Sequence, residues 1–481
     1  MNRKIILYIL TRLLAVESVI ITLSGLVSLL YGDQDYMSFF ISAAISMVLS
    51  LIIYPFVRNS EKSLGKREGY IVVSLVWVIF SVFGALPFYV SGAIPSYTDA
   101  FFETMSGFTT TGASILNDIE SLSHGLLFWR SITQWLGGMG IIVMALAIFP
   151  ILGIGGMQLF VAEVPGPTPD KLHPRIKGTA KRLWGIYILL TAIETLLLYF
   201  GGMTLFDAIN HSFTTMATGG YSTKQLSIAY YNSPYIEYVI SLFMFLAGMN
   251  FTLSFFAMRL KFSKIYKNEE FRWYLIGTIA ITVLIAFFLV IHQGLGIEKA
   301  FRDSLFQVVS ILTTTGYATA DYMLWPPFVV VIIFMLMFIG GSAGSTGGGP
   351  KVMRVMLLLK NSYFEFKRIM HPKALIPVRM NNRAVDPKII ANIQAFIVVY
   401  IIIFVIGTIL MSSMGLDLDT SMGAVIACLG NIGPGIAGVG PANNFFAIPD
   451  SGKWLLSVFM LIGRLELFTV LVLFTPHFWK K

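Results

Sequence analysis

The chain has 481 residues, of which 56% are hydrophobic and only 12% are charged, whereas a soluble globular protein carries about 25% charged residues. This composition excludes a soluble globular domain with a polar, water-exposed surface. It indicates a polytopic membrane protein with roughly ten helical crossings. The single cysteine, Cys428, excludes an intrachain disulfide and a cysteine-based metal site.

The net charge of +9 does not indicate a nucleic-acid partner, because the basic residues follow a topological pattern. Most of the 34 Lys and Arg residues lie in alternate loops or at the two termini. Loops rich in Lys and Arg stay on the cytoplasmic side of a membrane. We therefore expect both termini and the basic loops to be cytoplasmic, and the more acidic alternate loops to be external.

The N-terminal part predicts a helical hairpin that stands apart from the rest of the pattern. Its two apolar runs, 5–30 and 37–57, are joined by a short polar turn, and we assign residues 1–68 to it. The remaining chain predicts four pore repeats, each with an apolar run, a short half-helix, a glycine loop and a second apolar run. The expected repeats are 69–181, 182–270, 271–387 and 388–481.

The four glycine loops recur at matched positions. Each follows a segment that is too short to cross a membrane and too apolar for a free loop, which predicts a re-entrant half-helix with Asp or Thr as its N-cap. The interval from cap to glycine is the same in all copies, a strong sign of internal repetition. The pairs are Asp99 and Gly112, Asp207 and Gly220, Asp303 and Gly316, and Thr420 and Gly433.

The apolar runs that flank these loops predict full crossings, two in each repeat. Two basic connections separate the repeats: a proline-rich linker, 165–174, and the longest basic stretch, 360–388. The expected crossings are 70–92 and 126–150, 183–203 and 234–258, 272–293 and 326–358, and 388–412 and 453–475.

Four such loops suit the coordination of a dehydrated monovalent cation. Non-helical backbone at membrane depth is tolerated only where it is buried in protein or lines water, so the loops indicate a shared aqueous axis. Rings of backbone carbonyls replace the hydration shell of the ion, and glycine supplies the conformations that point successive carbonyls one way. One such loop alone is more often an ordinary glycine cap of a helix; four matched copies favour a pore.

The loops resemble the filter loops of the TrkH/Ktr/HKT superfamily of potassium transporters, most closely the bacterial TrkH type with its extra N-terminal hairpin. The residues that carry the resemblance are 109–114, 218–222, 313–321 and 431–435, and it covers essentially the whole chain. It implies potassium sites on the backbone oxygens of Thr110, Thr111, Gly112, Thr218, Gly219, Gly220, Thr314, Thr315, Gly316, Asn431, Ile432 and Gly433.

Two of these loops leave their register or pattern open. The second loop could place either Gly219 or Gly220 opposite Gly112, and the spacing favours Gly220. The fourth departs from the Thr-Gly pattern, with Asn431, Ile432 and Pro434 around its glycine. We therefore expect a less regular contribution from the fourth loop.

The second apolar run of repeat three is interrupted by a glycine-rich segment that ends at Pro350. Such a segment cannot stay helical, because each Gly costs about 1 kcal/mol and Pro about 3 kcal/mol in a helix interior. We expect an intramembrane gate beneath the loops, as in the family it resembles; the alternative is a cytoplasmic linker. The gating residues are Gly340, Gly341, Ser342, Ala343, Gly344, Ser345, Thr346, Gly347, Gly348 and Gly349.

Arg464 lies inside the last predicted crossing, where a charge costs about 2.5–3.5 kcal/mol and is usually functional. By resemblance we expect it to point into the pore beside the glycine-rich segment; the alternative is a structural ion pair with another helix. Glu466 faces another way and is a poor partner for it. Glu17 and Glu194 have no predicted role beyond polar helix packing, and His211 is predicted to be packed rather than to bind a ligand.

The sequence predicts no enzyme, because it contains no nucleophile–base arrangement and no cluster of His, Cys, Asp and Glu with metal-ligand spacing. It predicts uptake of potassium ion across the cytoplasmic (inner) membrane through a channel-like pore. An ion-coupled secondary transporter, moving potassium with sodium or a proton, is the alternative.

The resemblance also implies partners. It implies a homodimer in the lipid bilayer and a cytosolic TrkA- or KtrA-like nucleotide-binding regulatory protein, so that the nucleotide would be bound by the partner and not by this chain. The basic loops and residues 360–388 are candidate docking surfaces, although the topology of a membrane protein explains each basic residue equally well.

Overall fold

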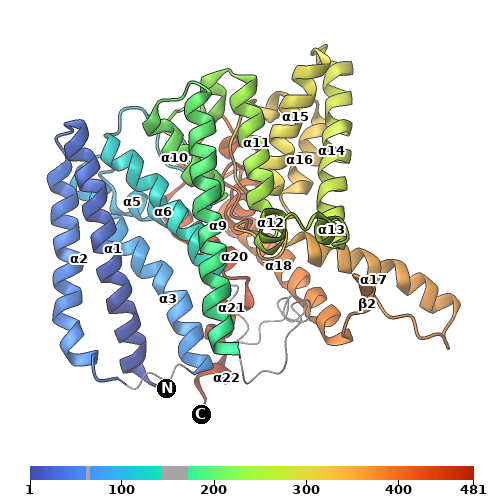
Figure 1. Ribbon diagram of the computed structural model, residues 1–481, viewed down its shortest axis with the longest axis horizontal. Helices are drawn as coiled ribbons and strands as arrows, with labels where there is room; N and C mark the ends of the chain where they lie inside the picture. Colours follow the sequence, from blue (N-terminus) through green and yellow to red (C-terminus); the bar gives the residue numbers. More distant parts are fainter. Residues whose placement is uncertain (61–64, 144–171, 481) are drawn as a thin grey trace.

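The computed structural model describes residues 1–60, 65–143 and 172–480, and it confirms the expected all-α membrane fold (Figure 1). The N-terminal hairpin, α1 (Arg3–Tyr31) and α2 (Tyr36–Val57), lies at one edge of the molecule. Small polar side chains let its two helices approach closely, because their hydroxyls bond across the pair. Ser18 Oγ donates to the carbonyl of Ala43 (2.8 Å), and Ser50 Oγ donates to the carbonyl of Thr11 (2.9 Å).

Each repeat contains a long first helix, a half-helix and a second helical segment. Repeat one contains α3 (Lys66–Gly84), α4 (Leu86–Val90), the half-helix α5 (Tyr97–Phe108) and α6 (His124–Val143). Repeat two contains α9 (Leu172–Phe200), the half-helix α10 (Leu205–Met216), η3 (Ser227–Tyr231), α11 (Pro234–Gly248), α12 (Phe251–Met258) and α13 (Phe262–Tyr266).

The second half of the chain follows the same order. Repeat three contains α14 (Glu269–Gln293), the half-helix α15 (Ile297–Leu312), η4 (Tyr322–Leu324), α16 (Pro327–Leu336), α17 (Val352–Met370), β1 (Arg379–Met380) and β2 (Arg383–Ala384). Repeat four contains α18 (Pro387–Ser413), the half-helix α19 (Leu418–Leu429), η5 (Ala437–Val439), α20 (Asp450–Arg464), α21 (Phe468–Leu471), η6 (Val472–Phe474) and α22 (Pro476–Trp479).

Two crossings that we predicted as single runs, 234–258 and 453–475, are broken. In each, two helices meet at a bend of 110°. The first breaks before Asn250, whose side chain caps α12 by accepting from the amide of Thr252 (2.8 Å). The second breaks where Glu466 and Leu467 adopt positive φ. The described residues therefore contain six continuous helices long enough to cross a membrane, or eight spans if each bent pair counts as one.

The predicted N-caps of the half-helices were wrong by about one turn in α5, α10 and α19, and by about two turns in α15. Ser96 caps α5 and Thr204 caps α10, each by accepting from the amide of the aspartate that we had taken as the cap. A hydroxyl that precedes an acidic residue in the first turn is the more complete capping arrangement. The remaining half-helices begin at N-caps Gly296 and Asp417, so that Asp303 and Thr420 both lie inside a helix.

Two sequence features fall wholly or partly outside the described residues. These are the end of the predicted crossing 126–150 and most of the linker 165–174. The basic stretch 360–388 is described: α17 runs out from the body of the molecule, and the short β1–β2 hairpin follows it (Figure 1).

A buried ion pair joins the first and last repeats. Lys453 Nζ of α20 lies 2.5 Å from Asp99 Oδ1 of α5, and the two side chains are 4% and 13% exposed. Removing one member of such a pair leaves the other charge buried and unpaired, which costs about 3–5 kcal/mol. We expect Lys453→Met to lower the melting temperature in detergent clearly, and the double variant Lys453→Met/Asp99→Leu to regain most of the loss. Equal losses in the single and double variants would contradict this pairing.

Candidate functional site

The four half-helices end in the same hydrogen-bonded cap. In each, a backbone amide just beyond the helix donates to the carbonyl five residues earlier. The amide of the residue before it donates to the carbonyl three residues earlier. This is the Schellman arrangement of a helix C-terminus. The first of these bonds joins Thr111 to Ser106 (2.8 Å), Gly219 to Thr214 (2.9 Å), Thr315 to Ser310 (2.8 Å) and Ile432 to Ala427 (2.8 Å).

Each cap places a non-glycine residue in the left-handed region. Such a position usually holds glycine, and a β-branched residue there is strained. Strain of this kind gathers at functional sites, where the surrounding structure holds it. A left-handed glycine follows in each loop. The pairs are Thr110 (φ 50°) and Gly112 (φ 82°), Thr218 (φ 53°) and Gly220 (φ 74°), Thr314 (φ 58°) and Gly316 (φ 83°), and Asn431 (φ 53°) and Gly433 (φ 100°).

This backbone correspondence fixes the register of the loops. Gly220, and not Gly219, is equivalent to Gly112 in the second loop. The fourth loop follows the same backbone path despite its different sequence, because Asn431 takes the left-handed conformation that Thr takes elsewhere. Asparagine tolerates this region better than most residues.

The loops close into a ring, because the glycine of each loop meets a carbonyl of the next. We call the four carbonyls at these contacts, on Thr111, Gly219, Thr315 and Ile432, the loop ring. A Cβ on Gly112 would lie 2.1 Å from the Gly219 oxygen, on Gly220 1.9 Å from the Thr315 oxygen, on Gly316 2.0 Å from the Ile432 oxygen, and on Gly433 2.9 Å from the Thr111 oxygen. The structure therefore brings all the predicted loop residues to one place and leaves no room for a side chain at the glycines.

Threonine hydroxyls add a second set of oxygens beside the ring. Thr109 and Thr111 are joined through their hydroxyls at 2.8 Å, and Thr313 and Thr315 are joined in the same way at 2.7 Å. The buried hydroxyl of Thr110 has no hydrogen-bond partner within the described ranges. A buried, unbonded hydroxyl of this kind has a free lone pair for a cation.

The glycine-rich segment, 340–350, lies against the ends of three half-helices. Its Gly348 amide donates to Thr314 Oγ1 (2.6 Å), and its Thr346 hydroxyl donates to the carbonyl of Met216 at the end of α10 (3.0 Å). A Cβ on Gly348 would lie 2.6 Å from the carbonyl oxygen of Gly430 after α19. Most of the segment is buried, so it is not an exposed linker.

Two buried basic side chains hold this segment. Arg464 Nη1 donates to the carbonyl of Thr346 (2.7 Å), and Nη2 donates to the carbonyl of Gly137 in α6 (3.0 Å). Lys351 Nζ donates to the carbonyls of Gly347 and Gly348. Arg464 thus contacts the segment beside which we expected it, and its guanidinium bonds carbonyls rather than a carboxylate in the part of the chain that the structure describes.

The neighbouring carboxylate is used elsewhere. Glu466, which we expected to be a poor partner for Arg464, lies just beyond the end of α20 and pairs with Arg354 of α17. Glu466 also adopts positive φ, and it lies at the break of the last crossing.

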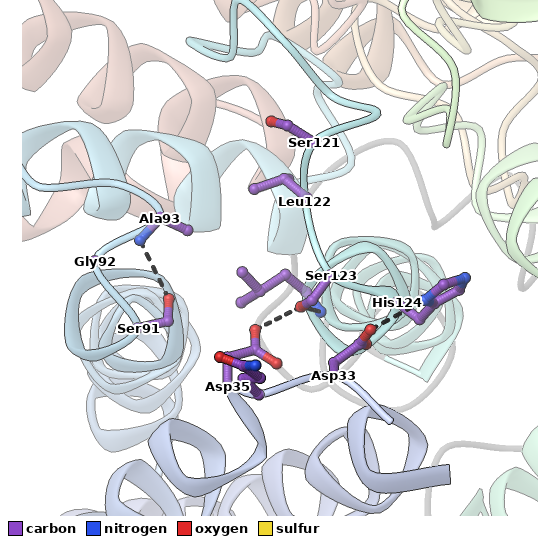
Figure 2. A pocket seen from close by; sticks show the side chains of 11 residues that line it. Asp33, Asp35, Ser91, Gly92, Ala93, Ser121, Leu122, Ser123 and His124 are labelled. Atoms are coloured by element: carbon purple, nitrogen blue, oxygen red, sulfur yellow. Dashed lines mark hydrogen bonds and ion pairs between the residues drawn. The ribbon is translucent and has the colours of Figure 1, made fainter. Parts of the chain in front are cut away.

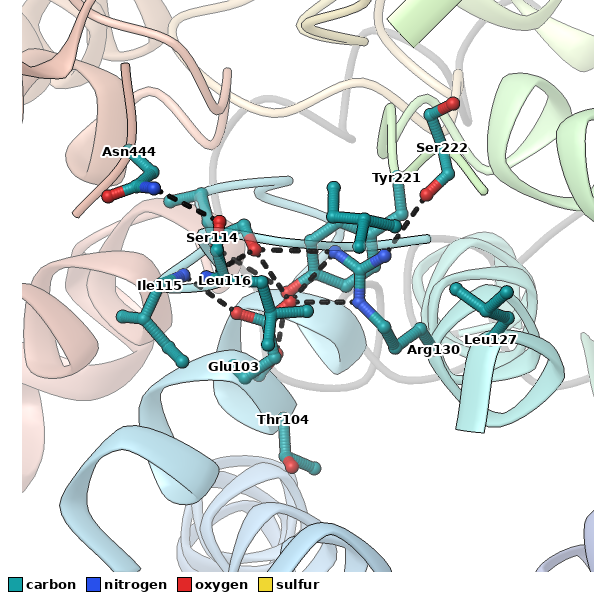
Figure 3. Close-up of polar contacts among 12 residues, drawn as sticks. Glu103, Thr104, Ser114, Ile115, Leu116, Leu127, Arg130, Tyr221, Ser222 and Asn444 are labelled. Atoms are coloured by element: carbon teal, nitrogen blue, oxygen red, sulfur yellow. Dashed lines mark hydrogen bonds and ion pairs between the residues drawn. The ribbon is translucent and has the colours of Figure 1, made fainter. Parts of the chain in front are cut away.

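Sequence reasoning missed a buried polar cluster behind the ring, which Figure 3 shows. Arg130 of α6 pairs with Glu103 of α5 at 2.9 Å, and the two side chains are 2% and 0% exposed. The carboxylate accepts from the amide of Ile115 (3.0 Å), and Arg130 donates to the carbonyl of Ser222 (3.1 Å). One signal in the sequence could have indicated this cluster. Arg130 is a charged residue inside a predicted crossing, as Arg464 is.

A cavity of about 550 Å³ opens where the N-terminal hairpin meets repeat one (Figure 2). Its acidic residues are already bonded. Asp33 lies 3.3 Å from His124 Nδ1, and Asp35 accepts from Ser123 (2.5 Å) and Ser28 (2.7 Å). These contacts attach the hairpin to repeat one, and they leave the cavity without an unbonded carboxylate.

Two further carboxylates are buried at membrane depth. Neither Glu17 nor Glu194 has a hydrogen-bond partner among the residues that the structure describes, and they are 1% and 0% exposed.

His211 is packed within α10, where its Nδ1 lies 2.8 Å from the carbonyl of Asp207 and its Nε2 lies 2.9 Å from Ser222 Oγ.

Comparisons with known proteins agree on one family. A model of the TrkH family, described as cation transport protein, matches residues 36–481. The chain is 41% identical over 463 residues to the Trk system potassium uptake protein TrkH of Salmonella typhimurium, covering 95% of each, and 39% identical over 485 residues to that of Halomonas elongata, covering 100% of each. The crystal structure of the potassium transporter TrkH from Vibrio parahaemolyticus superposes with a TM-score of 0.92 at 38% identity and covers 100% of both chains.

Proposed function

The chain belongs to the TrkH family of cation transport proteins, and from this premise we propose that it takes up potassium through a pore that passes the loop ring. The single observation that carries the proposal is the closed contact of four equivalent loops, in which each glycine abuts the carbonyl of the next loop. Four carbonyls at equivalent positions can replace part of the water around an ion without fixing a net charge beside it.

In this mechanism the loop ring is the selectivity filter. An arriving potassium ion exchanges water for the carbonyl oxygens of Thr111, Gly219, Thr315 and Ile432. The half-helices contribute their C-terminal partial charges, about −0.5 each, near the base of the loops. The Thr110 hydroxyl is free to face the ion at the inner end. A membrane potential drives the ion inward with about 2.3 kcal/mol per 100 mV.

The glycine-rich segment then acts as the gate. Its contacts with the ends of α10, α15 and α19 support a position across the inner exit of the filter. Arg464 and Lys351 hold it there through carbonyl oxygens, which are contacts that a moving loop can exchange for water. Conduction requires that the segment move aside.

We propose that the protein works in the cytoplasmic (inner) membrane as a homodimer with a cytosolic TrkA- or KtrA-like nucleotide-binding regulatory protein. The relatives are named as parts of a Trk system, which supports a multi-component assembly. The nucleotide would bind to the partner. The basic stretch 360–388, which comprises the outer part of α17 and the β1–β2 hairpin that follows it, is the surface we assign to that contact (Figure 1).

Flux into proteoliposomes tests the central proposal. Purified protein should admit rubidium, a potassium analogue, down its gradient, and external potassium should compete with the uptake more strongly than sodium does. Protein with the same detergent history but with Gly112→Ser should admit none, because the serine Cβ would lie 2.1 Å from the Gly219 oxygen. Rubidium uptake that is equal in both preparations would refute the proposal.

The second candidate is coupled transport of potassium with sodium or a proton. The buried, unbonded carboxylates Glu17 and Glu194 favour it, because an ionisable group at membrane depth is usually functional. The same vesicles distinguish the two mechanisms. A sodium or pH gradient imposed at zero membrane potential drives potassium accumulation only if the ions are coupled.

A further inference from the structure

The four half-helices carry different side chains at one equivalent position. Counting back from the left-handed glycine of each loop by the same interval gives Glu103 in α5, His211 in α10, Gln307 in α15 and Ala424 in α19. All four residues are buried. The position faces the outer limb of the loop, the part that follows the glycine.

The first three side chains bond this outer limb. Glu103 accepts from the amide of Ile115 (3.0 Å) and from Ser114 Oγ (3.0 Å), as Figure 3 shows. His211 bonds Ser222 Oγ at 2.9 Å. Gln307, with its amide oriented so that the oxygen faces the backbone, accepts from the amides of Thr319 (2.9 Å) and Ala320 (3.3 Å).

The same helix positions also receive bonds from the next repeat. The residue after the left-handed glycine is a tyrosine in loops two and three. Tyr221 donates its hydroxyl to the carbonyl of Glu103 (2.7 Å), and Tyr317 donates to the carbonyl of His211 (3.1 Å). The outer limbs of neighbouring loops therefore share an anchor.

Repeat one adds a charge to this arrangement. Arg130 pairs with Glu103, donates to the carbonyl of Ser222 in loop two, and stacks over the ring of Tyr221 with 4.1 Å to its centroid. Through this one guanidinium, loops one and two are fixed to each other as well as to their own half-helices.

Repeat four, where the position is Ala424, uses backbone contact instead. A Cβ on the neighbouring Gly423 would lie 2.6 Å from both the nitrogen and the oxygen of Ile436, and one on Gly435 would lie 2.4 Å from the Gly423 oxygen. The carbonyl of Gly435 also accepts from the hydroxyl of Tyr322 (2.5 Å). Close packing of α19 against its own loop thus replaces the side-chain bond.

We propose that Glu103, His211 and Gln307, with Arg130, are positioning residues that set the width of the loop ring and thereby the preference for potassium over sodium. This inference rests on the proposed filter. A carbonyl ring that can contract also fits the smaller sodium ion. A hydrogen bond that holds the outer limb in place prevents this contraction, so it affects the ratio of potassium to sodium permeability more than the rate of conduction. None of these side chains is itself assigned as an ion ligand.

The most direct test replaces Gln307, because it is the one positioning residue that is neither charged nor titratable. Gln307→Met keeps the volume of the side chain and removes its hydrogen bonds to loop three. We expect the ratio of potassium to sodium permeability in proteoliposomes to fall by about three- to tenfold, the scale on which the loss of one buried hydrogen bond acts. Potassium flux itself should change less than the ratio does.

Ser304→Ala is the matched control, because Ser304 is buried on the same helix and its hydroxyl has no partner among the described residues. It should leave the ratio unchanged. If Gln307→Met does not yield folded protein, His211→Leu, assayed in the same way, must lower the ratio.

The outcomes separate the inference from the function on which it rests. Wild-type protein without any preference for potassium would overturn the proposed function. Selective wild-type protein whose ratio survives both the Gln307 and the His211 substitution would overturn the positioning role alone.

Discussion

Replacing Gly220 by Ala is expected to abolish potassium and rubidium uptake. The new Cβ would lie 1.9 Å from the Thr315 carbonyl oxygen, and backbone atoms of a closed ring cannot retreat from it. The residue also adopts φ 74°, which costs an L-residue about 1 kcal/mol or more. Because the displaced atom is one of the proposed ion ligands, we expect loss of flux by at least about two orders of magnitude, on the scale of several kcal/mol of lost ion binding. Rubidium flux into proteoliposomes measures it.

Gly277→Ala is the control for this substitution. Gly277 lies in α14, where an added Cβ would have no heavy atom within 4 Å, and its φ lies outside the left-handed region. The variant should transport like the wild type and melt at the same or a slightly higher temperature, since alanine favours helix more than glycine does. If Gly220→Ala also transported normally, the loop ring would not be the path of the ion.

Arg464→Ala is expected to increase flux through protein purified without the proposed regulatory partner. The substitution removes both charged hydrogen bonds of the guanidinium, one to the carbonyl of Thr346 in the glycine-rich segment and one to the carbonyl of Gly137 in α6. A hydrogen bond to a charged group contributes about 1.5–3 kcal/mol, so losing even one shifts the equilibrium toward the open state by about tenfold or more. Single-channel recording or rubidium flux without the partner measures the change.

Arg464→Lys should give an intermediate effect, because an ammonium group keeps the charge and cannot span the two carbonyls with a planar fork. The melting temperatures of all three proteins should be recorded beside the fluxes, since a buried arginine is also a packing element. A flux for Arg464→Ala that equals the wild-type value, in protein that is folded, would remove the gating role from this residue.

The sequence predicted the ring because its signal is local and repeated. The left-handed conformations at the end of a half-helix restrict the residue types at a few adjacent positions, as at Thr110 and Gly112. The same restriction recurs in the other three repeats. The register of the second loop could be chosen for Gly220 from spacing alone, and the left-handed conformation of that glycine agrees with the choice.

The breaks in the second helices of repeats two and four could not be predicted, because they depend on partners far away in the sequence. Gly248-Met249-Asn250 reads as part of an apolar run, yet the carbonyl of Gly248 accepts from the amide of Ser342 (2.8 Å), a contact that exists only after the chain has folded. Likewise, the last crossing breaks just beyond the end of α20, where Glu466 pairs with Arg354. The N-caps were misplaced for a simpler reason: the capping hydroxyls of Ser96 and Thr204 precede acids that are themselves good caps.

The sequence did not indicate the proposed positioning residues, for a different reason. Glu103, His211 and Gln307 share no chemistry, so no motif connects them; only the equivalence of their positions does. Their partners lie on the outer limbs of the loops, whose paths the sequence leaves open. A search for polar residues at equivalent positions of the four repeats would have found them.

Anomalous diffraction from crystals of the protein grown in rubidium shows where the ion binds. We expect a rubidium peak on the axis of the loop ring, within coordinating distance of the carbonyl oxygens of Thr111, Gly219, Thr315 and Ile432. Crystals that show this ring empty, with rubidium bound at another place in the protein, would contradict it.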